Sequence, residues 1–152
     1  MPKNLPKLFL SIGLCLGAGI LGMFFTVSAI PVWYSTLVKP TFSPPNWIFG
    51  PVWTILYILM GVSLYLVWTS KKKVVPTVFW VQLILNALWS IIFFGMHNPK
   101  LALTDILALW FFISLTIDRF AKINKLAGNL LIPYIAWVSF AVFLNFSIAI
   151  LN

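Results

Sequence analysis

The sequence predicts an all-α integral membrane protein, a bundle of five transmembrane helices that its first loop caps at one end. Three observations lead to this fold class. Hydrophobic residues make up 62% of the 152 residues and charged residues only 8%, whereas a soluble domain carries roughly a quarter charged residues. Five apolar runs approach or exceed the roughly 20 residues that cross a bilayer. A loop rich in proline and tryptophan separates the first two runs.

The expected helices form a single domain over residues 1–152 and cover 8–29, 47–69, 77–95, 101–119 and 127–150. Pro31 ends the first helix, because proline lacks the N–H that a helix interior needs. Three consecutive lysines, 71–73, end the second, and Pro76 opens the third. The fourth ends at Asp118 and Arg119, and the fifth reaches almost to the C-terminus.

The first helix has the character of a retained span rather than a cleaved signal. Lys3 and Lys7 precede it, and the small residues at 27–29 resemble a cleavage site. Its apolar stretch of 23 residues, 8–30, exceeds the roughly 7–15 residues of a signal's apolar core.

Basic residues orient the five spans. Eight of the ten fall on the side of the N-terminus, namely Lys3, Lys7, Lys71, Lys72, Lys73, Arg119, Lys122 and Lys125, and only Lys39 and Lys100 fall on the other. Lys and Arg are enriched in cytoplasmic loops. We therefore expect a cytoplasmic N-terminus in a plasma membrane, with the loop facing outward, and we do not expect binding of nucleic acid.

Polar residues inside the spans mark candidate interior positions. Asn86, Asp105 and Asn145 are costly in hydrocarbon and should face the bundle interior. The two asparagines can bridge helices or contact a ligand, and Asp105 can cap or tether the fourth helix or contact a ligand. Trp53 and Tyr57 share one helix face, and a second stripe combines Trp137, Ala141, Leu144 and Asn145. Such stripes can line one cavity.

The chain contains few residues of the types that form conventional catalytic or metal sites. The only cysteine, Cys15, lies in an apolar run and is expected to be buried. The only histidine, His97, lies at a helix end, where it can be an interfacial residue or an axial haem ligand, but it cannot form a protein-only metal site alone. Gly13 and Gly17 form a GxxxG motif, which serves close packing inside the bundle or dimerisation.

Four separated motifs resemble the translocator protein family, also called tryptophan-rich sensory proteins or peripheral-type benzodiazepine receptors. The first is WYSTLVKPTFSPPNWIFGPVWTILY at 33–57. The others are LNALWSIIFFG at 85–95, LALTDILAL at 101–109 and LLIPYIAWVSFAVFLN at 130–145. The resemblance extends over roughly residues 10–148, nearly the whole chain.

The resemblance implies a five-helix bundle that is usually dimeric, with a pocket under a lid formed by the first loop. It implies porphyrins such as protoporphyrin IX and haem as ligands, with no required cofactor. In bacterial relatives two tryptophans are implicated in porphyrin breakdown, and their counterparts here are Trp53 and Trp137. The pocket positions carried over by the motifs are Tyr34, Phe49, Trp53, Asn86, Trp137, Ala141 and Leu144.

Departures from the animal members limit the resemblance. Leu101 stands where they carry a tryptophan, and Asn145 lacks the tyrosine and arginine that follow it in their cholesterol motif, so we do not expect cholesterol binding there. The missing basic tail indicates a bacterial member. The resulting interpretation is a membrane tetrapyrrole-binding protein with a sensing or regulatory role. A light- and oxygen-dependent porphyrin-degrading enzyme, a porphyrin or lipid transporter, and a structural or regulatory partner protein remain alternatives.

Overall fold

The computed structural model describes residues 4–72 and 74–152, and within them the chain is helical without strands. The elements are α1 Leu5–Ala29, η1 Tyr34–Thr36, η2 Asn46–Ile48, α2 Phe49–Trp68, α3 Thr77–Ser90, the π-helical turn η3 Ile91–Gly95, α4 Pro99–Ile123, α5 Lys125–Asn129 and α6 Ile132–Leu151. Five segments of this described part are long and apolar enough to cross a membrane. The five-helix bundle expected from the sequence is therefore confirmed.

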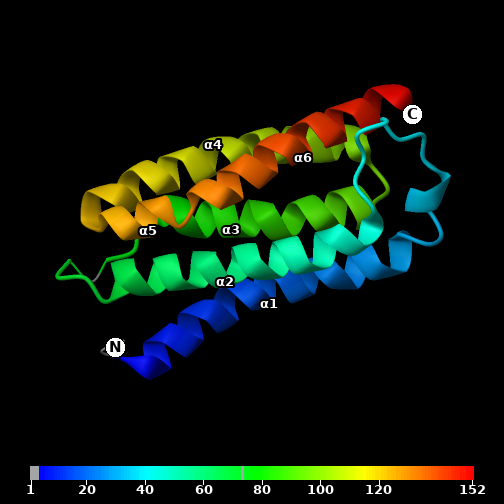
Figure 1. Ribbon diagram of the computed structural model, residues 1–152. Coiled ribbons are helices and arrows are strands. Elements are labelled where there is room, and N and C mark those ends of the chain that lie inside the picture. The colour runs from blue at the N-terminus through cyan, green and yellow to red at the C-terminus, as the bar shows by residue number, and fades with distance from the viewer. Residues whose placement is uncertain (1–3, 73) are drawn as a thin grey trace.

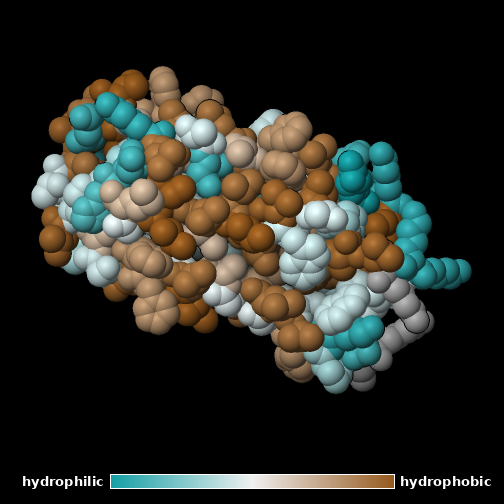
Figure 2. All heavy atoms as spheres, turned by 180° about the vertical axis from the view of Figure 1, so that it is seen from behind, coloured by the Kyte–Doolittle hydropathy of each residue, from teal (hydrophilic) through white to brown (hydrophobic). Residues whose placement is uncertain are grey.

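The helices run roughly along one axis, and the two chain ends lie at opposite ends of the bundle (Figure 1). α4 and α6 form one side, α3 lies next to α4, and α1 crosses α2 obliquely on the other side (Figure 1). The first loop, between α1 and α2, lies at the same end as the C-terminus (Figure 1). Brown, hydrophobic side chains cover the middle of the surface and teal ones gather at its two ends (Figure 2), as a bilayer requires.

Asparagine side chains cap the N-termini of three helices, α1, α4 and α5. The Asn4 and Asn98 side chains accept hydrogen bonds from the backbone N–H groups of Lys7 (3.2 Å) and Leu101 (3.0 Å). Asn124 does the same for α5. These side chains satisfy donors that a helix start leaves free. Pro99 follows its cap at the first helical position, where proline's missing N–H costs nothing.

Apart from shifts of two or three residues at the starts of α1, α2 and α4, the structure differs from the expected helices in three places. The last segment, expected as one helix over 127–150, is divided into α5 and α6 by a turn at Leu130 and Leu131. α4 continues to Ile123, beyond the expected end at residue 119. In this extension Asp118 forms an ion pair with Lys122 one turn later (3.1 Å). α3 ends in the π-turn η3, after which His97 adopts a left-handed backbone conformation with φ of 53°.

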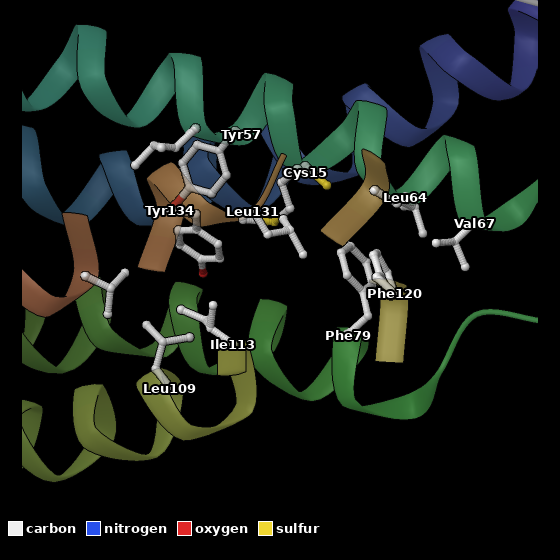
Figure 3. Close-up of a cluster of buried hydrophobic side chains, with 14 of the residues drawn as sticks. Cys15, Tyr57, Leu64, Val67, Phe79, Leu109, Ile113, Phe120, Leu131 and Tyr134 are labelled. Atoms are coloured by element: carbon white, nitrogen blue, oxygen red, sulfur yellow. The ribbon is translucent and has the colours of Figure 1, made fainter. Parts of the chain in front are cut away.

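The interior contains two apolar clusters. The larger one fills the middle of the bundle and its N-terminal end, and its buried members include Cys15, Tyr57, Leu64, Val67, Phe79, Leu109, Ile113, Phe120, Leu131 and Tyr134 (Figure 3). The smaller one lies toward the first loop and contains Ala29, Tyr34, Phe93, Phe94, Ala102, Leu144 and Ile148. The expected burial of Cys15 is confirmed, with no exposed surface.

Glycine permits the closest helix contacts. A Cβ added at Gly61 of α2 would lie 2.5 Å from the Ile12 Cα of α1, and one added at Gly128 of α5 would lie 2.7 Å from the Ala121 Cβ of α4. Lipid offers little hydrophobic drive for helices to associate, so such close packing stabilises the bundle. Gly13 and Gly17 differ, because an added Cβ there meets nothing within 4 Å. The first GxxxG pair therefore does not pack inside the bundle.

Candidate ligand-binding cavity

A cavity of about 400 Å³ lies in the half of the bundle that faces the first loop. All seven expected ligand-contact residues line it: Tyr34 from the loop, Phe49 and Trp53 from α2, Asn86 from α3, and Trp137, Ala141 and Leu144 from α6. Residues from α1 and α4 complete the wall. The structure thus brings together positions that are up to 110 residues apart in the sequence.

Aromatic rings form two parts of the wall. The Trp53 ring stacks on the Tyr57 ring with 5.6 Å between the ring centroids and an interplanar angle of 29°. It also contacts the Tyr134 ring edge-on, with 6.4 Å between the centroids. Trp137 contacts Phe49 edge-on at 6.2 Å and Phe140 at 5.4 Å. Neighbouring aromatic rings therefore hold both indoles in place. A cavity wall of this kind suits a flat apolar molecule.

The floor of the cavity is a buried hydrogen-bond network that joins three helices. The Tyr57 hydroxyl of α2 donates to the Asn86 carbonyl oxygen of α3. The Asn86 amide donates to the Tyr134 hydroxyl of α6 (2.7 Å), which donates in turn to Gln82 (2.8 Å). Asn86 therefore bridges helices and lines the cavity at once, so the two roles expected for it are compatible.

Asn145 and Asp105 differ in position. The Asn145 side chain accepts from the Trp89 indole N–H (2.9 Å) and donates to the Pro99 carbonyl oxygen (2.8 Å), which ties α6 to α3 and α4. Asn145 also lines the cavity. Asp105 is 8% exposed and lies outside the cavity wall, and its Oδ2 atom has no hydrogen-bond partner among the described residues. Asn98, not Asp105, caps α4.

The chemistry of the wall is that of uncharged groups. No charged side chain belongs to the described residues that line the cavity. Its polar atoms are amides, hydroxyls and indole N–H groups, and the buried indole N–H of Trp137 has no acceptor in the described part of the protein. Within residues 4–72 and 74–152 no three His, Cys, Asp or Glu side chains gather. The wall therefore offers contacts to a ring system rather than ligands to a metal.

Sequence reasoning missed the contribution of α1. Its cavity face consists of Leu16, Gly19, Ile20, Met23, Thr26 and Val27, which recur every three or four positions. α1 is apolar almost throughout, and Thr26 is the one polar residue among these six, so little distinguished this face from the lipid-facing one. The spacing of Gly19, Met23 and Thr26 was the only available signal.

The first half of the loop is tied to the rest of the protein. The Trp33 ring stacks on the His97 ring at 4.6 Å and 6°. His97 therefore serves as an interfacial stacking partner, and it is not among the cavity residues. The Lys39 ammonium donates to the Tyr34 and Leu37 carbonyl oxygens (2.9 and 3.2 Å). Burial raises the pKa of the Tyr34 hydroxyl above its ordinary value, although Ser43 opposes part of the shift, so the phenol stays neutral near pH 7.

The side chain of Asn152 forms hydrogen bonds with the same loop. The Val38 N–H donates to the Asn152 side-chain oxygen (3.0 Å), and the Asn152 amide donates back to the Val38 carbonyl oxygen (2.9 Å). This reciprocal pair joins positions 114 residues apart. It holds the loop against the end of α6.

Replacing Asn152 by alanine (Asn152→Ala) is expected to loosen the loop by about 1 kcal/mol, the usual net worth of such a bond. Hydrogen exchange should detect this as a roughly fivefold faster exchange of the Val38 amide, since local opening limits that rate. Asn129→Ala, at the opposite end of the bundle, is the matched control. Unchanged exchange at Val38 would show that the Asn152 pair does not restrain the loop.

Comparison with known proteins gives consistent similarities over the whole chain. The sequence profile of the TspO/MBR family matches residues 11–151. "Tryptophan-rich protein TspO" of Chlorobaculum tepidum is 49% identical, over 100% of this chain and 99% of the relative. "Translocator protein" of Homo sapiens is 40% identical over 76% and 72% of the two chains. "Tryptophan-rich sensory protein" of Cereibacter sphaeroides is 36% identical over 79% and 77%.

Proposed function

This chain belongs to the TspO/MBR family, and from that premise we propose that it is a membrane tetrapyrrole-binding protein with a sensing or regulatory role. Its ligand is a porphyrin such as protoporphyrin IX or haem, and the protein needs no other cofactor. The observation that carries this proposal is the uncharged cavity with Trp53 on one wall and Trp137 on another. A porphyrin macrocycle is flat, apolar and aromatic, which matches that wall.

Each wall residue has a role in this proposal. The Trp53 and Trp137 indoles contact the faces of the macrocycle, from α2 and α6. The unpartnered Trp137 N–H and the Asn86 amide supply polar contacts, together with the Tyr34 hydroxyl. Phe49, Ala141 and Leu144 complete the apolar surface, and the first loop closes over the ligand as a lid.

The test is a titration of protoporphyrin IX into detergent-purified protein in the dark. Binding is measured by the quenching of tryptophan fluorescence and by the change in the porphyrin absorption band. We expect saturable binding that weakens at least tenfold in the Trp53→Phe/Trp137→Phe variant, because stacked rings contribute about 0.5–1.5 kcal/mol each beyond their buried area. Trp80→Phe/Trp110→Phe is the matched double control, as both side chains lie outside the cavity. Wild-type-like binding by the first variant would remove Trp53 and Trp137 as ligand contacts.

A second function, light- and oxygen-dependent breakdown of protoporphyrin, is favoured by the position of the same two tryptophans on the cavity wall. Porphyrin itself absorbs the light and activates oxygen, so this chemistry belongs largely to the ligand. Illumination of the titrated samples in air separates the two functions. A discrete product that forms only when Trp53 and Trp137 are both present would put the enzyme first, whereas the same products from free porphyrin would leave a binding protein.

We further propose a bacterial plasma-membrane location with a cytoplasmic N-terminus. The end of the bundle that holds the N-terminus also holds Lys7, Lys71, Lys72, Arg119, Lys122 and Lys125, and the loop end holds Lys39 and Lys100. Lys3 and Lys73 lie outside the described residues. A homodimer is also proposed, supported by Gly13 and Gly17, which are exposed and leave room for a second helix.

A further inference from the structure

We propose that the cavity opens sideways into the membrane, between α1 and α2, and that ligand passes through this portal from the leaflet on the side of the first loop. The inference rests on the proposed function for the identity of the ligand, while the portal itself follows from the packing of α1. A portal of this kind would admit only ligands that dissolve in lipid. The residues that form it belong to α1 and α2.

Two close contacts join α1 and α2, one near the start of α1 and one at the level of Tyr57. A Cβ at Gly61 would lie 2.5 Å from the Ile12 backbone, and one at Gly19 would overlap the Tyr57 ring. These two contacts close the seam between the helices up to the level of Tyr57. Tyr57 itself lies on the cavity floor, in the hydrogen bond with Asn86.

Beyond Tyr57, the close contacts of α1 are with α3 and η3. A Cβ at Gly22 would lie 2.9 Å from the Ser90 hydroxyl oxygen of α3. One at Gly95 of η3 would lie 2.7 Å from the Phe25 ring of α1. α1 and α3 are therefore in close contact at the level of the cavity, and we place the lateral opening between α1 and α2.

The residues on both sides of that opening are exposed although they line the cavity. On α1 they are Ile20, Met23 and Val27, with 51%, 51% and 62% of their surface exposed. On α2 they are Gly50 and Thr54. None carries a charge, and both helices belong to segments that can cross a membrane. A rim of this composition faces hydrocarbon rather than water.

The route from water is more restricted than the route from lipid. The first half of the loop is fixed by the Trp33–His97 stack and by the Asn152–Val38 pair. A molecule that is flat, apolar and uncharged over most of its surface partitions into the bilayer before it meets the protein. The portal then admits it with its apolar part still out of water.

Gly50 keeps the portal wide. A Cβ at this position meets nothing within 4 Å, so the space beside it is open. A large side chain there can fill the portal without displacing other side chains. Val27, on the opposite rim, offers the same test from α1.

The test uses a cysteine introduced by Ser90→Cys in a Cys15→Ser background, because Ser90 lines the cavity and Cys15 is the only native thiol. The protein is reconstituted in phosphatidylcholine vesicles. One sample receives a lipid-soluble pyrene maleimide, and another receives a charged, membrane-impermeant methanethiosulfonate. Gly50→Phe and Val27→Trp are the portal variants, and Ile84→Trp is the control at an exposed, apolar position of α3 outside the cavity.

We expect the lipid-soluble reagent to label position 90 faster than the charged reagent. Each portal variant should slow that labelling at least tenfold, and the Ile84→Trp control should not. Equal labelling by the charged reagent, or unchanged rates in both portal variants, would overturn the portal. This readout needs no porphyrin, so failure of the proposed function, seen as absent porphyrin binding by the wild type, is a separate result.

Discussion

Replacing Gly61 by leucine (Gly61→Leu) is expected to destabilise the bundle by about 3 kcal/mol, a large share of the roughly 5–15 kcal/mol by which folded proteins are stable. Even the first carbon of the new side chain would lie 2.5 Å from the Ile12 Cα. That neighbour is backbone, so it cannot rotate away as a flexible side chain can. α1 would have to move off α2, and the closed part of the seam between them would be lost.

Thermal unfolding in detergent measures this effect, with Gly61→Ala as an intermediate that should lose about 1–2 kcal/mol. Gly13→Leu and Gly13→Ala are the matched controls, because a side chain at Gly13 meets nothing within 4 Å. They should not destabilise the bundle, because a glycine inside a helix is itself about 0.5–1 kcal/mol less favourable than alanine. If Gly61→Leu unfolded like the wild type, the described contact between α1 and α2 would be wrong.

Replacing Asn86 by alanine (Asn86→Ala) is expected to cost about 2–3 kcal/mol. The Tyr57 hydroxyl would lose its acceptor, and the Tyr134 hydroxyl would keep only its bond to Gln82. Each hydrogen bond between membrane helices is worth about 0.6–1.7 kcal/mol, and a buried group left without a partner adds about 1–3 kcal/mol. Part of that penalty disappears if water from the cavity reaches Tyr57, which keeps the expected total below the sum.

The same unfolding measurement, with Asn46→Ala as control, tests the Asn86 prediction, because Asn46 lines the cavity but is exposed at its mouth. A Tyr57→Phe variant adds a second arm. Since Asn86 and Tyr57 share one bond, the double variant should cost less than the two single variants together. Strictly additive effects would show that the two side chains do not act as a pair.

Much of the fold could be predicted from the sequence, since membrane insertion depends on long apolar runs that are easy to recognise. The division of the last helix was missed, because residues 127–150 are mostly apolar and long enough for a single span. Its break at Leu130 and Leu131 comes from tertiary packing, in which Gly128 lies against Ala121 of α4. Pro133 was the visible signal, because a proline seven residues into a continuous helix would remove a backbone hydrogen bond and clash with the preceding turn.

The candidate site could be predicted only where its residues stand out from their surroundings. Asn86 and Trp137 did, as a polar residue in a span and as a deep tryptophan, and the family motifs carried the remaining positions on α2 and α6. The α1 face did not, because Met23 and Val27 are ordinary lipid-compatible residues. Their role depends on how α1 packs on α2 and α3, which glycine contacts with Tyr57 and Ser90 determine. Such contacts are pairwise and leave no pattern in a single sequence.

The uncharged cavity wall also determines how the site responds to membrane voltage. A potential of 100 mV changes the free energy of an elementary charge that crosses the whole bilayer by about 2.3 kcal/mol. No described residue of the wall carries such a charge, so the site itself contributes no voltage-sensing element. Only the charges that a ligand brings would couple its binding to an energised membrane, and occupancy by a neutral ligand would be the same in an energised and in a depolarised cell.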